Sequence, residues 1–139
     1  MNWILWALLS AFFAALTAIL AKMGVAHLDA NLATAVRTSV VVLFAWAIAL
    51  ATNRQSFHAA LDKKTLLYLT LSGAATGLSW ICYFHALKLG PASRVAPIDK
   101  LSVPLVLLFS WLLLGEKITP MVLLGGALIT AGALVIAFA

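Results

Sequence analysis

The sequence contains little charge and a single cysteine. Of its 139 residues, 9% are charged and 65% are hydrophobic, whereas soluble domains average about 25% charged and about 45–50% apolar residues. A soluble domain of this size needs more polar side chains to cover its surface. One cysteine, Cys82, supports neither a disulfide framework nor a cysteine-based metal site within one chain. These shortages exclude a soluble globular domain, a disordered chain and a disulfide scaffold.

Motifs of common enzymes and nucleotide-binding sites are also missing. The chain has no P-loop, no nucleophile elbow and no HExxH sequence, and its three histidines are scattered. The longest basic run is Lys63-Lys64, without interleaved aromatic residues, so the net charge of +5 does not predict nucleic-acid binding. We therefore expect no enzymatic activity, no metal, no cofactor and no nucleic-acid partner.

Long apolar stretches dominate what is present. A membrane-spanning helix needs about 20 apolar residues, and the length allows five such helices in one transmembrane domain over residues 1–139. Asn31 is predicted to cap the second helix, and residues 52–64 are predicted to include a short interfacial helix. The fold class is therefore an all-α membrane protein, in contact with the lipid bilayer. The predicted spans are 3–21, 31–51, 65–87, 92–114 and 120–139.

Five spans place the two termini on opposite sides of the membrane. The loops on the N-terminal side carry one more Lys or Arg than the loops on the other side, which favours an N-terminus inside. An excess of one leaves insertion in both orientations open. The basic residues counted are Arg54, Lys63, Lys64 and Lys117 on the first side, and Lys22, Lys88 and Arg94 on the second.

Three charged residues, Arg37, Asp99 and Lys100, are predicted to lie deep inside the spans. Arg37 lies six residues after Asn31, about 9 Å deep, and Asp99 and Lys100 lie seven and eight residues after Ala92, about 10–12 Å deep. Both spans begin on the side opposite the N-terminus, so the three charges are expected in one layer. Intramembrane charges are costly and indicate functional sites. Their net charge of +1 favours a site for an anionic or carboxylate-bearing group.

The third span ends on the same side and adds amphipathic side chains to this layer. Counted back from Leu87, Tyr83 lies about 6 Å deep and Trp80 about 10 Å deep. Ser79 shares a helix face with Tyr83. The predicted substrate-binding or gating residues are Arg37, Lys100, Asp99, Trp80, Tyr83 and Ser79.

Each charge also has a structural interpretation. Arg37 is near enough to the membrane surface for its long side chain to snorkel, and Asp99 can neutralise Arg37 or Lys100 in a structural pair. The fourth span adds Pro97 and Pro104, which each remove a helix hydrogen bond on either side of Lys100. A helix interrupted around a lysine suits a cavity wall, and a packing kink is the structural alternative.

Several short motifs recur in a specific order along the chain. In the second half these are Ala86-Leu87, Ala96-Pro97, Leu114–Thr119 and Gly126–Gly132. They resemble the EamA-type unit of the drug/metabolite transporter superfamily, and the earlier stretches Ala35–Thr38 and Ser79–Leu87 resemble its single-unit, five-helix branch. The resemblance covers nearly the whole chain and implies an inner-membrane protein that moves small metabolites or drug-like solutes. Relatives with two inverted units imply that this chain works as a homodimer or with a second small subunit.

Two functions therefore remain from the sequence. The first is a secondary transporter that works by alternating access, with an antiparallel dimer forming the inverted pair of repeats. The second is a non-transporting membrane subunit of a heteromeric complex, such as a component of a lipid-carrier flippase. Efflux of organic cations by an acidic residue in the first helix is disfavoured, because that helix contains no Asp or Glu.

Overall fold

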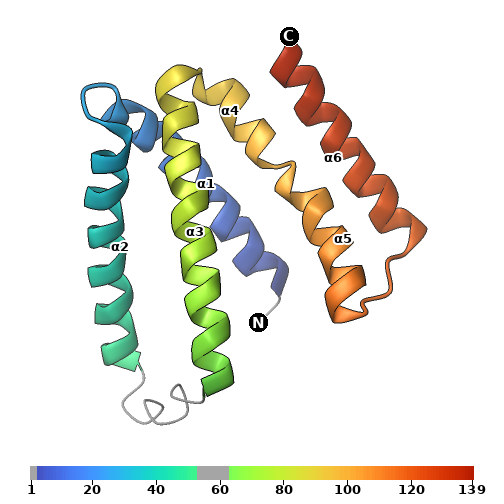
Figure 1. Cartoon of the computed structure of the whole chain (residues 1–139). Helices are drawn as coiled ribbons and strands as arrows, with labels where there is room; N and C mark the ends of the chain where they lie inside the picture. Colours follow the sequence, from blue (N-terminus) through green and yellow to red (C-terminus); the bar gives the residue numbers. More distant parts are fainter. Residues whose placement is uncertain (1–2, 53–62) are drawn as a thin grey trace. The chain divides into compact units, whose positions relative to one another are not determined.

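The structure is a computed structural model that describes residues 3–52 and 63–139. Over those residues the chain is all-helical (Figure 1), and α4 and α5 together form one apolar stretch. Five stretches are thus long and apolar enough to cross a membrane, as predicted. The predicted interfacial helix falls on residues 53–62, outside the described residues. The helices are α1 (Trp3–Val25), α2 (Ala30–Thr52), α3 (Lys63–Leu89), α4 (Ala92–Asp99), α5 (Ser102–Leu114) and α6 (Pro120–Phe138).

Large apolar side chains cover the outside of these helices. Leu113 is 80% exposed and Phe138 is 87% exposed, while the few buried apolar side chains include Val25 and Leu87. Such an extensive apolar surface is not tolerated on a soluble monomer. It is the surface expected of helices whose solvent is lipid, because a helix satisfies its backbone groups internally and needs no water.

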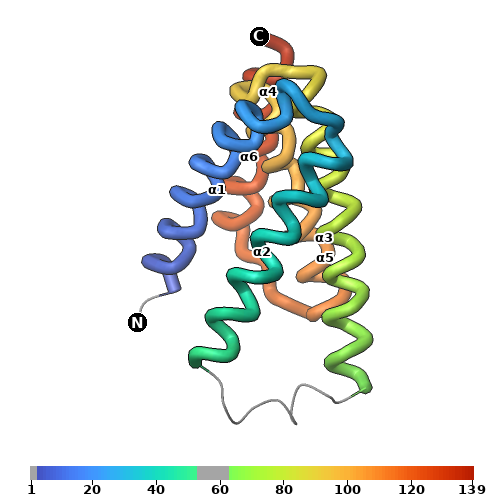
Figure 2. The backbone as a smooth tube through the Cα atoms, turned by 90° about the vertical axis from the view of Figure 1, so that its left-hand side faces the viewer, coloured from blue at the N-terminus to red at the C-terminus, as the bar shows by residue number. Residues whose placement is uncertain are grey.

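The chain divides into two compact units, and the first comprises Ala21–Lys88. Within it, α2 and α3 run in opposite directions, and the turn after α1 lies at the end of α3 (Figure 1, Figure 2). Lys22 at the end of α1 donates to the carbonyl of Leu87, and Lys88 donates to the carbonyl of Leu28 at 3.0 Å. These bonds tie the last turn of α3 to the turn between α1 and α2.

Asp29, and not Asn31, caps the start of α2. The Asp29 Oδ1 atom accepts from the backbone N–H groups of Asn31 at 2.9 Å and Leu32 at 3.2 Å, which satisfies two donors that lack partners within the helix. The predicted cap was wrong because α2 begins one residue earlier, at Ala30. Asn31 is therefore inside the helix, and its side-chain oxygen lies 3.2 Å from Nε2 of His85.

The second unit comprises the start of the chain through Leu20, together with Leu89–Ala139. Here α6 packs against both α4 and α5. Gly126 on α6 permits a close approach, because a Cβ atom there would lie 2.8 Å from Cδ1 of Leu107. Thr119 caps α6 by accepting from the N–H of Val122 at 3.4 Å, and Pro120 follows in the first turn, where its missing N–H costs nothing.

The fourth span is broken at Lys100, between the two prolines. The N–H of Lys100 donates to Pro97 and that of Leu101 donates to Ile98, both three residues back. The carbonyl of Lys100 accepts from Val103 because Pro104 has no N–H to offer it. The local hydrogen bonds are thus those of a tighter 3₁₀ turn. This confirms the predicted interruption and separates α4 from α5.

Candidate functional site

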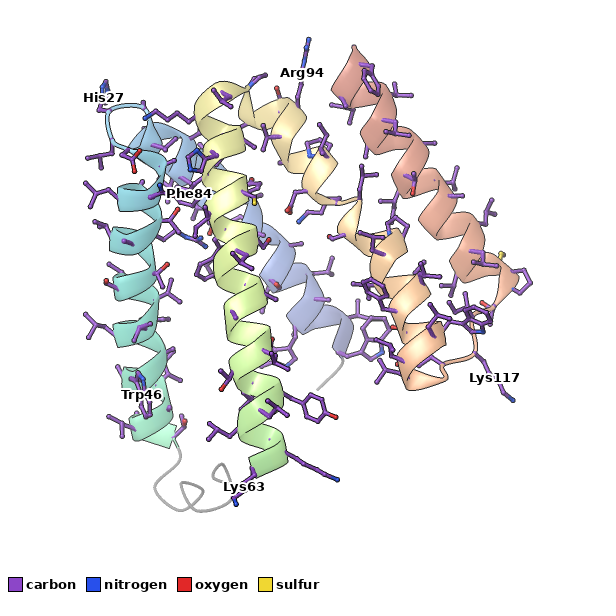
Figure 3. All side chains as sticks on the ribbon, in the orientation of Figure 1. His27, Trp46, Lys63, Phe84, Arg94 and Lys117 are labelled. Carbon is purple, nitrogen blue, oxygen red and sulfur yellow. The ribbon has the colours of Figure 1, made fainter. Side chains whose placement is uncertain are left out.

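Arg37 on α2 lies against two aromatic rings of α3. Its Cζ atom is 4.2 Å from the ring centroid of Trp80 and 5.6 Å from that of Phe84. Trp80 and Phe84 are one helical turn apart and therefore share a face of α3. Figure 3 shows Phe84 in the space between α2 and α3. Stacking of this kind stabilises a guanidinium by about 0.5–2 kcal/mol, with the larger values in desolvated sites.

Tyr83 also belongs to this cluster, because it interacts electrostatically with Arg37. Ser79 is exposed on α3, and no interaction described for it joins it to Arg37. Phe84, in contrast, was not predicted as a site residue, although it is 97% buried in the structure (3% exposed). Its spacing of four residues from Trp80 was the signal that pointed to it, since positions i and i+4 lie on one helix face.

No carboxylate among the described residues compensates the charge of Arg37. Within residues 3–52 and 63–139, no Asp or Glu lies within 4.0 Å of its guanidinium, and no hydrogen bond uses one of its N–H groups. Arg37 stands seven residues into α2, about 10 Å from its start. A partly buried cation at this depth, held by aromatic rings and with unused donors, has the properties of a binding group.

A rim of polar side chains lies at the end of this unit where α2 begins and α3 ends. Asp29, His85 and Lys88 lie here, and each already has a partner: the backbone of α2, Asn31 and Leu28 respectively. The N–H groups of Leu32 and Asn31 hold the pKa of the Asp29 carboxyl below its ordinary value, and the charges of Lys88 and His85 lower it further. Asp29 is therefore ionised at neutral pH.

Asp99 and Lys100 lie in the other unit, at the break between α4 and α5. The Nζ atom of Lys100 is 3.3 Å from Oδ2 of Asp99, and their side chains are 56% and 40% exposed. This neighbouring carboxylate neutralises the lysine locally, which matches the pairing considered from the sequence. Because the two units are each described by themselves, the predicted convergence of Arg37 with this pair stays a prediction.

A cavity of about 900 Å³ lies beside α5 and α6 and was not predicted from the sequence. Its walls are mostly apolar, and Glu116 and Lys117 lie at the connection between the two helices. No group of three or more His, Cys, Asp or Glu residues that can hold a metal ion occurs in the described part of the chain. Residues that line the cavity include Pro104, Leu107, Trp111, Gly126, Thr130 and Leu134.

The comparisons with known proteins agree with this architecture. The model of the EamA-like transporter family matches residues 1–138, which is nearly the whole chain. The chain belongs to the EamA-like transporter family. A relative from Sinorhizobium sp, named "Uncharacterized transporter in cobO 3'region", is 52% identical over 136 residues, covering 98% of this chain and 96% of the relative. No solved structure matches the chain.

Membership of the EamA-like family and the five apolar stretches identify a multi-pass membrane protein. The name of the relative supports a role in transport rather than in catalysis. The relative is covered almost completely by a chain of five spans, so it too is the size of a single unit.

Proposed function

We propose that this EamA-like protein is a secondary transporter that moves a small metabolite or drug-like solute across the inner membrane, with its N-terminus inside. Arg37 is the binding group, and Trp80 and Tyr83 line the site with Ser79 beside them. The observation that carries the proposal is the guanidinium of Arg37 stacked on Trp80 at 4.2 Å, inside a membrane-spanning helix and without a carboxylate partner among the described residues. A transporter needs such a site within the bilayer, whereas a purely structural subunit does not.

The turn at Lys100, between α4 and α5, is the segment that changes conformation in this mechanism. Alternating access requires one segment of the wall to move while the site is retained. The single 3₁₀ turn between α4 and α5, held between Pro97 and Pro104, is the weakest point of the fourth span because fewer α-helical bonds hold it. The Asp99–Lys100 pair at that turn is the gating element.

A second unit completes the transport pathway. In an antiparallel pair, two charged layers about 10 Å from opposite faces of a core about 30 Å thick lie about 10 Å apart across the midplane. That spacing suits a cavity reached alternately from either side. A homodimer satisfies this geometry, as does a pair with a second small subunit. Tag-accessibility measurements on intact cells are expected to find both orientations; a single orientation without a differently oriented partner contradicts the antiparallel pair.

Transport itself is tested without knowing the solute. Proteoliposomes are loaded with a metabolite extract, and the solutes released are identified by mass spectrometry. We expect the wild-type protein to release a defined subset, and an Arg37→Gln variant of equal thermal stability to release that subset roughly 10–150-fold more slowly. Release no faster than from protein-free liposomes contradicts the proposal. Stable co-purification of another membrane protein together with absent release supports the alternative, a subunit of a heteromeric complex.

A further inference from the structure

We infer that Arg37 recognises a small monocarboxylate, which it holds through two N–H···O bonds in the plane of its guanidinium. The inference names the substrate class of the proposed transport site and therefore rests on that proposed function. It depends on three properties of Arg37: which parts of the guanidinium are occupied, how deep it lies, and what charge surrounds it.

The aromatic contacts leave the donor edge of Arg37 unused. The Cζ atom lies over the ring of Trp80, at 4.2 Å from its centroid, with Phe84 at 5.6 Å. A guanidinium stacks through its faces, while its five N–H donors point outward in its own plane. None of the hydrogen bonds described for residues 3–52 and 63–139 occupies these donors. The ring contacts thus hold the group in place, and its N–H donors stay available to bind a carboxylate in bidentate fashion.

The position of the guanidinium argues against snorkelling. Counted back from Leu89, Phe84 is about 7 Å and Trp80 about 13 Å from the end of α3. The Cζ atom of Arg37 is closer to the deeper ring than to the shallower one. A snorkelling arginine extends its side chain toward the membrane surface, where water solvates the charge. The side chain of Arg37 instead stays beside the deeper ring.

The surrounding charge selects a monoanion. Tyr83 lies near Arg37, and this end of the unit also carries Asp29, His85, Lys88 and Lys22. Lys22 and Lys88 donate to backbone carbonyls, and Asp29 is held by the backbone of α2 and interacts with Lys88 and His85, so no carboxylate among the described residues balances the charge of Arg37. One carboxylate cancels this charge. A phosphate dianion leaves an excess negative charge in the membrane layer, which is costly to bury.

The test measures binding by the purified full-length protein in nanodiscs of zwitterionic lipid. The probes are benzoate and butyrate, their uncharged amides benzamide and butyramide, and phenyl phosphate. We expect both carboxylates to bind and to raise the apparent melting temperature, and both amides to bind at least about tenfold more weakly, because they lose the charge-assisted bonds. Phenyl phosphate is expected to bind more weakly than benzoate.

Variants distinguish a specific role of Arg37 from the effect of removing one positive charge anywhere in the protein. Arg37→Gln is expected to weaken benzoate binding at least about tenfold, and Arg37→Lys to weaken it by a smaller factor, since lysine keeps the charge but not the planar fork. Arg94→Gln is the matched control, because Arg94 is exposed and points away from α4 (Figure 3); it is expected to bind benzoate normally. Because Arg37→Lys retains the cation, it keeps the test valid if Arg37→Gln fails to fold.

Four results overturn the inference: equal binding of carboxylates and amides, tighter binding of phenyl phosphate than of benzoate, equal losses in Arg37→Gln and Arg94→Gln, or no carboxylate binding by the wild-type protein. The transport proposal fails separately. Arg37-dependent benzoate binding without release from loaded proteoliposomes rejects transport and keeps the carboxylate site, whereas release restricted to solutes without a carboxylate rejects the substrate class and keeps transport.

Discussion

Arg37 and Lys100 are both cations in membrane-spanning stretches, but their surroundings differ. Lys100 stands beside Asp99, at 3.3 Å, in a short turn between two helices. Arg37 stands in an unbroken helix and rests on the rings of Trp80 and Phe84. A carboxylate neutralises the lysine, whereas the quadrupoles of aromatic rings stabilise the arginine and leave its charge in place. Arg37, which has no carboxylate partner in the described part of the chain, is therefore the better candidate for binding a solute, and Lys100 is the better candidate for a conformational change.

The largest expected effect separates the two cations directly. Arg37→Gln is expected to slow solute release from proteoliposomes by roughly 10–150-fold, because a hydrogen bond to a charged group contributes about 1.5–3 kcal/mol. Lys100→Gln is expected to slow release by less, because its charge is already neutralised. Initial release rates, compared at equal protein content, measure the difference. Equal losses in both variants contradict the division of roles.

A smaller effect is expected when the aromatic support is removed. Trp80→Leu is expected to weaken solute binding roughly 2–30-fold, which corresponds to about 0.5–2 kcal/mol of cation–π stabilisation. Phe84→Leu is expected to weaken it less, since that ring is farther from the guanidinium. Trp46→Leu, which changes an exposed tryptophan of α2, is the matched control. Binding isotherms of the three variants rank the contributions, and a ranking led by Trp46 contradicts the site.

A double-mutant cycle measures the coupling energy between Asp99 and Lys100 at the helix break. Asp99→Asn is expected to lower the melting temperature because it leaves Lys100 without its carboxylate, and adding Lys100→Gln is expected to restore part of the loss. The coupling is expected to be at most about 1 kcal/mol, since both side chains are substantially exposed. Thermal unfolding of the wild type, both single variants and the double variant measures it. A coupling of zero means that the contact is incidental.

The smallest effect concerns the rim above Arg37. The pKa of Asp29 is lowered in the folded protein, so its contribution to stability is present above the pKa of the unfolded chain, about 3.9, and is lost as the pH falls through the lower folded value. The melting temperature of the wild type is therefore expected to fall in this acidic range more steeply than that of Asp29→Asn. Parallel pH profiles contradict the role assigned to this cap.

Much of the fold was predictable because apolar length is a local property. The spans and the break near Lys100 each depend on a few consecutive residues, and the structure confirms them. The cap of α2 was mispredicted because Asp29 and Asn31 are both good caps, and the choice depends on where the helix begins. The candidate site was predicted only as a group of residues at similar depth in the membrane, because depth was the only coordinate that the sequence provided.

The sequence by itself determined an all-helical membrane protein of five spans and the depth of each charge, because hydrophobic length and helical rise are properties of consecutive residues. Only the tertiary structure decided which side chains meet those charges. Residues 37 and 80 are far apart along the chain, and their contact depends on how α2 and α3 face each other. The tertiary structure brought Arg37 onto Trp80 and Phe84, and this contact singles out one charge among several as the candidate binding group.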